Sequence, residues 1–441
     1  MIKKLTIVLI AFLALQSQAQ EGTQSPYSFF GLGSLKFRGT VENQSMGGLS
    51  IFTDSIHVNL RNPASYAGNN LKVSPFNNEG RVVKFAVAGE LSSINLKANG
   101  QNEKTGTTTF DYLILNFPLG KFGVGFGLLP YTSVGYKLED NITLDGEELL
   151  KNRYYGDGGL NKVFVGVGYQ FTKDLSAGID INYNFGNVEN NSIEFGYDVN
   201  GDPLSSHSKE VNRSDLFGLS YNFGISYKPM ITQKLQLTSG LTYTPKSKIT
   251  SENQRAFGTI LYNFETEEEF ILNTIQADLA AQNLENTTLY LPARLSLGAG
   301  IGQPHKWFVG AEYTNLKTSQ YSNAIFSTNS NATFEDSSTF AIGGFFIPQY
   351  TSFNKYLKRV VYRAGAHYGN TGLKINDESI NEFGISFGVG LPVGNMFSNV
   401  NLGFEYGQRG TTKQNLVQED LFKLQISLSL NDRWFVKRKY N

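Results

Sequence analysis

The histidines and glycines of this chain are spaced in ways that argue against catalysis. The four histidines, His57, His207, His305 and His367, lie far apart and lack the close spacing of metal ligands. The glycines of residues 123–127 occupy every second position of a strand pattern, and no Gly-Lys-Ser/Thr follows them, so they do not predict a phosphate-binding loop. We therefore expect no enzyme activity, no cofactor and no metal site.

Charged residues on the polar faces of the predicted strands are the remaining candidates for chemistry. They can form ion pairs with one another or with the N-terminal part of the chain. Alternatively, Arg294 and Arg363 can bind the carboxylate of an amphipathic ligand, because a guanidinium matches a carboxylate with two parallel hydrogen bonds. The sequence leaves both uses open. The residues concerned are Asp180, Arg294, Glu312, Arg363, Glu382 and Glu405.

Alternation of apolar and polar residues with a period of two dominates the chain from residue 81 onward. Between Leu175 and Gly186, for example, every second side chain is apolar and the side chains between them are small or polar. Strands of this kind are typical of a transmembrane β-barrel, whose strands need about 9–11 residues to cross the bilayer. We expect the apolar face to contact lipid and the polar face to line a lumen.

The pattern predicts fourteen strands, and an even number allows the sheet to close without unpaired edges. The content of 46 glycines, 23 tyrosines and 33 phenylalanines also suits a sheet protein. A soluble β-sandwich shares this composition, but a sandwich of this length would show linkers between smaller domains. The predicted strands are residues 81–97, 105–117, 121–136, 158–171, 174–187, 214–228, 235–249, 287–301, 306–318, 334–348, 358–370, 380–391, 398–409 and 419–431.

Short and long connections alternate between these strands. Bacterial barrels have short turns in the periplasm and long loops outside the cell, so we expect both termini in the periplasm. In the loop 250–286, the stretch from Ile271 to Leu284 predicts a short helix. The short turns are 118–120, 172–174, 229–234, 303–305, 349–356 and 392–394, and the long loops are 137–157, 188–213, 250–286 and 319–333.

The beginning of the chain predicts export. Two lysines precede an apolar run from Leu5 to Leu15, and Ser17-Gln18-Ala19 provides small residues before a cleavage site, which indicates a signal peptide of residues 1–19. Cysteine is absent, so we expect neither a disulfide nor a lipid-modified cysteine. The 38 basic and 38 acidic residues leave no basic excess for nucleic acid. The cell outer membrane is the expected location, with its lipid bilayer as partner.

Residues 20–75 lack long alternation, yet they keep aromatic residues that a disordered tail would lack. Pro63 fixes its own φ and favours an extended Asn62, whose side chain can satisfy backbone groups of a tight turn. We expect residues 20–75 to fold inside the barrel as a plug, with Asn62, Pro63 and Ala64 bracing it against the wall. The alternative for these three residues is an ordinary turn that leads into the first strand.

The same segment resembles the N-terminal hatch of the FadL-type long-chain fatty-acid transporter family. The resemblance rests on Gly31-Leu32-Gly33, Met46-Gly47-Gly48-Leu49, Asp54 and residues 59–64, followed by a predicted fourteen-stranded barrel. The expected organisation is then a signal peptide (1–19), a hatch (20–75), a barrel (76–435) and a basic periplasmic tail (436–441).

The resemblance implies passive uptake of a hydrophobic or amphipathic small molecule, or of a lipid, that passes the hatch and leaves through a lateral gap or the periplasmic mouth. A second hypothesis is a barrel without transport activity that serves as a subunit of an outer-membrane protein assembly or secretion complex, with other outer-membrane proteins as partners. A nonspecific pore or an adhesin is a third. Bound lipid in an isolated barrel would favour the first hypothesis, and a stable stoichiometric partner would favour the second.

Overall fold

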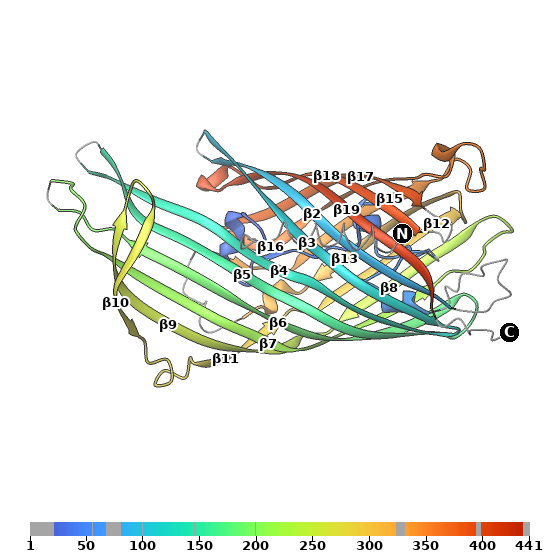
Figure 1. The fold of residues 1–441 in the computed structure, drawn as a ribbon, viewed down its shortest axis with the longest axis horizontal. Coiled ribbons are helices and arrows are strands. Elements are labelled where there is room, and N and C mark those ends of the chain that lie inside the picture. The colour runs from blue at the N-terminus through green and yellow to red at the C-terminus, as the bar shows by residue number, and fades with distance from the viewer. Residues whose placement is uncertain are drawn as a thin grey trace, which may run out of the picture.

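One antiparallel sheet closes on itself into a fourteen-stranded barrel (Figure 1). The computed structural model describes residues 22–54, 56–67, 81–98, 100–144, 147–198, 200–322, 331–393 and 398–434. The barrel closes where β19 (Gln418–Trp434) pairs with β2 (Arg81–Ala98) along its length. The predicted fold class is confirmed. The expected signal peptide and basic tail lie outside the described residues.

Three of the fourteen wall positions are each built from two consecutive strands, and the others from one. The double positions are β8 (Gln236–Thr244) with β9 (Ser247–Asn263), β11 (Asn286–Leu291) with β12 (Arg294–Gln303), and β14 (Ala332–Phe334) with β15 (Ser337–Phe346). With β2 and β19, the single strands are β3 (Gln101–Leu119), β4 (Phe122–Leu144), β5 (Glu147–Gln170), β6 (Leu175–Glu194), β7 (His207–Tyr227), β13 (Trp307–Leu316), β16 (Val361–Ile375), β17 (Glu378–Val393) and β18 (Ser398–Gly410). None of the helices in the described residues is long and apolar enough to span a membrane.

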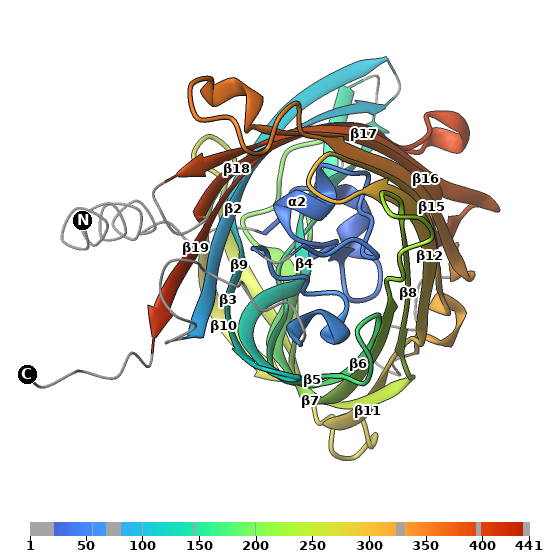
Figure 2. The same cartoon turned by 90° about the vertical axis from the view of Figure 1, so that its right-hand side faces the viewer.

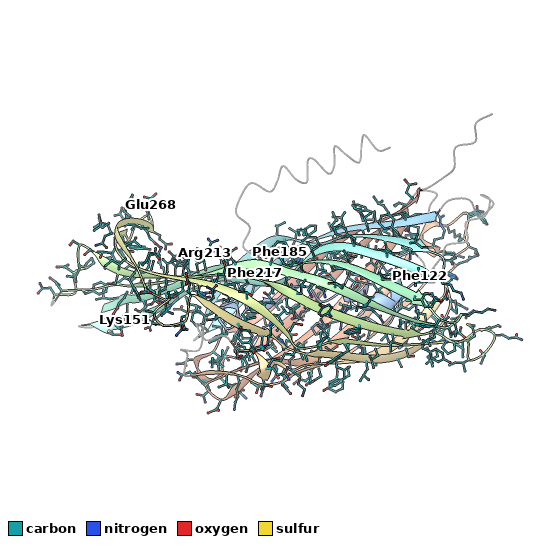
Figure 3. All side chains as sticks on the ribbon, turned by 90° about the horizontal axis from the view of Figure 1, so that it is seen from below. Phe122, Lys151, Phe185, Arg213, Phe217 and Glu268 are labelled. Atoms are coloured by element: carbon teal, nitrogen blue, oxygen red, sulfur yellow. The ribbon has the colours of Figure 1, made fainter. Side chains whose placement is uncertain are left out.

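The outer face of the barrel carries a belt of apolar side chains. On β6, Ile181 is 50% exposed, whereas its neighbour Asn182 is 3% exposed and faces inward. Figure 3 shows the belt running from Phe122 near one end of the barrel to Phe185 and Phe217, with Arg213 beyond it. Such a belt faces the lipid of an outer membrane. The alternation in the sequence therefore predicted correctly which face of each strand points outward and which points into the lumen.

One side of the barrel continues well past this belt. Strands β4 and β5 have 23 and 24 residues, whereas β12 and β13 have 10 each. The extension is formed by β4 to β7 and β9, with β10 (Glu268–Gln276) added at its edge (Figure 1). Most of the residues expected in the loops 137–157, 188–213 and 250–286 are therefore strand, because neighbouring chains keep pairing beyond the belt.

The helix expected between Ile271 and Leu284 is wrong. Glu268 to Gln276 form strand β10, which pairs with β9, and the residues that follow form turns. Phe270, Ile271 and Ile275 are aromatic or β-branched, and such residues favour a strand when a partner strand is available.

The described N-terminal residues 22–54 and 56–67, here called the inner segment, lie inside the ring of strands (Figure 2). Their short elements are η1 (Pro26–Phe29), β1 (Ser34–Leu35), α2 (Val41–Gln44) and η2 (Pro63–Tyr66). Phe37, Val41 and Tyr66 of the inner segment share a buried cluster with Tyr112 and Phe164 of the wall. The inner segment is thus packed on the wall by apolar contacts as well as by the polar contacts described next.

Candidate functional site

The Asn62-Pro63-Ala64 turn is fitted closely to the wall. Oδ1 of Asn62 accepts a hydrogen bond from the Ala64 amide at 3.1 Å, and its Nδ2 donates to the carbonyl oxygen of Ile225 at 3.1 Å. Below the turn, a Cβ added to Gly178 would lie 2.5 Å from the carbonyl carbon of Pro63, and one added to Gly224 would lie 2.2 Å from Oδ1 of Asn62. Only glycine leaves room for the turn at these two positions.

Buried ion pairs also hold the inner segment. Arg61 Nη2 lies 2.8 Å from Oε1 of Glu312 on β13, and Arg38 Nη2 lies 2.7 Å from Oε2 of Glu382 on β17. The Nε of Arg409 lies 3.3 Å from the same Glu382 oxygen. The first two contacts join the inner segment to strands that are distant in sequence, whereas Arg409 joins β18 to β17. Each contact satisfies a charge that is largely removed from water.

The structure separates the six predicted charged residues by their partners, and Glu382, paired with Arg38 and Arg409, is one of them. Glu312 binds Arg61, and Glu405 Oε1 lies 3.6 Å from Nζ of Lys423. Within the described residues, no carboxylate lies within ion-pair distance of Arg294. The other two residues bond to neutral amides: Asp180 Oδ2 accepts from Asn222 at 3.0 Å, and Arg363 Nη1 donates to Asn401 at 3.2 Å.

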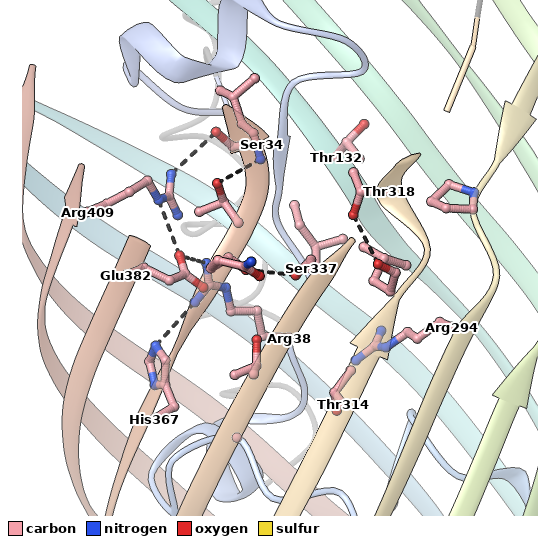
Figure 4. Close-up of a pocket in the computed structure, with 18 of the residues that line it drawn as sticks. Ser34, Arg38, Thr132, Arg294, Thr314, Thr318, Ser337, His367, Glu382 and Arg409 are labelled. Atoms are coloured by element: carbon pink, nitrogen blue, oxygen red, sulfur yellow. Dashed lines mark hydrogen bonds and ion pairs between the residues drawn. The ribbon is translucent and has the colours of Figure 1, made fainter. Parts of the chain in front are cut away.

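Arg294 borders a cavity of about 230 Å³ inside the barrel, here called the lumen cavity (Figure 4). Its wall combines apolar residues such as Phe30, Leu32 and Tyr321 with charged residues of both signs. The charged residues are Arg38, Arg61, Arg294, Arg409, Glu312, Glu382 and Glu405. The other six charged residues of this wall take part in ion pairs, so Arg294 is the cation of the described wall that is left for an anionic group. The apolar side chains can contact the rest of an amphipathic anion.

A second pocket, of about 470 Å³, lies where β3 and β4 part; we call it the lateral pocket. The two strands pair only from Leu113 opposite Leu128 to Leu119 opposite Phe122. Beyond this point β3 remains paired with β2, and β4 with β5, so the wall has a gap within the sheet. Phe110, Pro130 and Phe185 are among the residues that line the pocket.

Strand β1 of the inner segment pairs with the part of β4 that is not paired with β3. Ser34 pairs with Ser133 and Leu35 with Thr132, and the Lys36 amide donates to the Tyr131 carbonyl at 3.0 Å. Ser34 and Leu35 line the lumen cavity, Lys36 lines the lateral pocket, and Thr132 lines both. The contact between β1 and β4 is therefore the partition between the two hollows.

The gap between β3 and β4 was missed in the sequence, although Pro130 marks it. A proline cannot donate to a ladder and is confined to edges and bulges of a sheet. Pro130 falls inside the strand predicted at 121–136, and the pairing of β4 with β5 is indeed irregular between Pro130 and Thr132. The contributions of Lys36 and Arg38 carried no comparable signal, because only the folded chain brings them to the wall.

Ser386 belongs to a Gly-x-Ser-x-Gly sequence, Gly384 to Gly388, that would suggest a hydrolase in another setting. It lies within β17 and not at a strand-to-helix turn, and its Oγ accepts a hydrogen bond from the Gly47 amide at 2.9 Å. Ser386 thus holds the inner segment and is not an exposed nucleophile.

The barrel, its inner segment and its lateral gap define the class: an outer-membrane protein of FadL-type fold. The family model that matches this chain is that of BamG, over residues 1–441, and the chain belongs to the BamG family. The FadL-type fold is supported by the solved structures described next, whereas membership of the transporter family itself, which the hatch suggested, is not confirmed. No curated protein sequence matches the chain.

Solved structures with the same fold include three channels. The Ralstonia pickettii toluene transporter TbuX is 15% identical with a TM-score of 0.55, covering 91% of this chain and 99% of its own. The Pseudomonas putida toluene transporter TodX is 14% identical with a TM-score of 0.55, covering 92% and 100%. The monoaromatic hydrocarbon channel CymD is 14% identical with a TM-score of 0.53, covering 91% and 99%. These proteins are channels or transporters and not enzymes, and at such identities the likeness shows the fold alone.

Proposed function

We propose that this barrel takes up hydrophobic or amphipathic small molecules passively, through the lumen cavity and then the lateral pocket. The main support for this proposal is the position of β1, which separates the two cavities and is held to β4 by a short ladder of backbone pairs. Displacement of β1 opens a path from the lumen to the gap between β3 and β4. A molecule that leaves there enters the membrane without crossing the deeper part of the inner segment.

The residues around Arg294 support an amphipathic ligand with an anionic head. The guanidinium borders the lumen cavity without a carboxylate partner among the described residues, while apolar side chains such as Phe30 and Leu32 cover another part of the wall. A bound carboxylate would meet Arg294, and its apolar part would lie toward β1. Arg363 lines a different pocket, with His57 and Lys228, and has no place in this contact.

The proposed topology follows from the unequal ends of the barrel. The short turns lie at the end where β2 begins and β19 ends, and the long extension lies at the other. Short turns in the periplasm place both termini there and the extension outside the cell. In this arrangement residues 20–75 act as the hatch, and Asn62, Pro63 and Ala64 brace it.

A second function, as a non-transporting subunit of an outer-membrane assembly or secretion complex, is favoured by one observation. Several buried ion pairs, including Arg61 with Glu312 and Arg38 with Glu382, hold the inner segment in place. Breaking a buried pair typically costs about 3–5 kcal/mol. A plug fixed this firmly would suit a structural role. The ion pairs named here do not involve the residues of β1, so they do not hold β1 itself.

Expression in a host that lacks its own uptake barrel tests the proposal. Uptake of laurate and of toluene should rise, whereas uptake of the polar sugar maltotriose should not. Arg294→Met should lower laurate uptake and spare toluene, because only laurate carries a carboxylate. Unchanged uptake of both hydrophobic probes, together with a stoichiometric protein partner in mild detergent, would replace transport by the structural role.

A further inference from the structure

The hairpin of β9 and β10 presents an apolar edge strand outside the belt. In the described part of the chain, β10 pairs with β9 alone. Its side chains Phe270, Ile271, Leu272 and Ile275 are all more than half exposed, with Ile275 at 68%. An exposed apolar edge strand invites pairing with another chain, and proteins normally cover or charge such an edge.

Membrane lipid does not reach this strand. On β7, Phe217 marks the border of the belt, and the charged residues Asp215 and Arg213 lie beyond it toward the extension (Figure 3). Phe217 pairs with Thr250 of β9, whereas β10 pairs with β9 only from Ala256 onward. At about 3.3 Å per residue, the nearest end of β10, Gln276, therefore lies about 20 Å along the strand beyond the belt, and the rest of β10 lies farther out.

The hairpin is fixed in place and not a loose appendage. Glu269 Oε2 lies 2.6 Å from Nζ of Lys209, and its carboxylate also accepts a hydrogen bond from the Tyr155 hydroxyl. Glu267 lies 2.7 Å from Lys137 Nζ and 3.3 Å from Arg153 Nη2. These contacts hold the hairpin against β4, β5 and β7, so its edge is prearranged for a partner.

The outer edge of β10 offers backbone hydrogen-bonding groups. The Ala277 amide donates to the Arg255 carbonyl at 2.8 Å, so this pair is a hydrogen-bonded pair of the ladder. Bonded and non-bonded pairs alternate in an antiparallel ladder. Thr274 and Gln276 therefore direct their N–H and C=O groups away from β9, and a second backbone is the ligand that satisfies such a row.

Charge at the tip of the hairpin distinguishes the kinds of partner. Glu265 and Glu268 are exposed, and no basic residue of the described chain lies within ion-pair distance of either. Glu268 accepts a hydrogen bond from the Thr266 hydroxyl at 3.2 Å, which leaves its charge without a basic partner. Two such carboxylates repel the phosphate groups of a lipid headgroup and attract lysine or arginine. A basic polypeptide fits this tip, and an anionic lipid does not.

We propose that β10 is the docking edge for an extended segment of a partner polypeptide, which adds to it as a further strand. The segment carries apolar side chains that cover Phe270, Leu272 and Ile275, and a basic residue that meets Glu265 and Glu268. Strand addition of this type draws affinity from the backbone and specificity from alternate side chains. The edge lies outside the belt and away from both cavities, so docking is independent of uptake.

The test is photo-crosslinking in native membranes with p-benzoylphenylalanine at position 270 or 275, and at Phe353 as the exposed apolar control in a short turn. Both β10 positions should crosslink to one segment of one protein. The two crosslinked sites in that segment should be separated by about as many residues as positions 270 and 275 are in β10. Thr274→Pro, which removes an outward N–H but no bond to β9, should lower the yield at least tenfold. Thr274→Ala, which keeps the N–H, should not.

Unchanged heat-modifiable mobility on gels confirms that each variant still forms the barrel. Glu265→Lys with Glu268→Lys provides a second variant without proline and should also reduce the crosslink. Adducts with lipopolysaccharide, with a second copy of this chain or with scattered segments of many proteins would overturn the proposal. So would the absence of adducts, or equal yields from Thr274→Pro and Thr274→Ala.

Discussion

The guanidinium of Arg61 meets the carboxylate of Glu312 at 2.8 Å, and both side chains are almost completely buried. The Ser50 hydroxyl donates to the same carboxylate at 2.9 Å. One strand of the wall thus holds two separate points of the inner segment, and the pair is a direct test of how firmly that segment is fixed.

Glu312→Ala should loosen the inner segment by about 3–5 kcal/mol, because it leaves the Arg61 charge buried without a partner. The expected result is new ion conductance in planar bilayers, with an intact barrel by heat-modifiable mobility. Arg61→Met together with Glu312→Met removes both charges and should conduct less than the single variant. Equal conductance of the single variant and the parent would show that the pair does not hold the segment.

Asn62→Ala with Pro63→Gly should also open the barrel to ions. The change removes the bonds of Asn62 to Ala64 and Ile225 and restores backbone freedom to the turn. Gly178→Val should act in the same direction, because its side chain collides with Pro63. Barrel closure depends on the wall strands, so insertion should be normal. If both variants insert and remain as closed as the parent, these three residues form only a turn.

Acid should release the inner segment near α2. Burial works to raise the pKa of Asp54, but His57 and hydrogen bonds from its amide and ring outweigh burial and hold this pKa well below the usual value. The pKa of Glu42 is likewise lowered, against the effect of burial, by His57 and Arg363. Carboxyls with a lowered folded pKa stabilise the folded state above their unfolded pKa, about 4, and lose that contribution as the pH falls further.

Conductance of the parent should therefore be low at pH 7 and pH 5 and rise below about pH 4. Asp54→Asn should conduct more at pH 7 and respond less to acid. A parent that stays closed at pH 3, or an Asp54→Asn variant with the full acid response, would assign the anchoring to other groups.

Tags report the proposed topology. An epitope inserted at Asn200, in the turn between β6 and β7, should bind antibody on intact cells, since this turn lies at the end of the long extension. An epitope between Thr232 and Lys234 should bind only after the outer membrane is permeabilised. The reverse pattern would place the termini outside the cell.

The fold was predictable because apolar and polar residues alternate with a period of two within each strand. Ile181 beside Asn182 identifies the lipid and lumen faces without any tertiary information, and short turns mark every second connection. The far ends of the strands were not predictable in this way. Beyond the belt, both faces of the strands carry polar residues, such as Glu189 and Arg213, and the alternation is lost. There the pairing of neighbours, and not burial in lipid, maintains the strand.

The candidate site was predictable only in part. Asn62 and Pro63 showed a turn because their effect is local, and alternation placed Arg294 and Glu312 in the lumen. Whether each charge has a partner depends on the path of the inner segment, which brings Arg61 to Glu312 across 251 residues of sequence. The route past β1 depends on the same path, and only Pro130 hinted at it.

A reversible crosslink between β1 and β4 tests the proposed route most directly. Ser34 and Ser133 are directly paired, and the chain contains no cysteine, so Ser34→Cys with Ser133→Cys creates a single candidate disulfide. Oxidised cells should lose laurate and toluene uptake, dithiothreitol should restore it, and Ser34→Cys alone should ignore both treatments. Equal uptake by the oxidised double variant and the parent, with the disulfide verified by mass spectrometry, would show that molecules do not pass between β1 and β4.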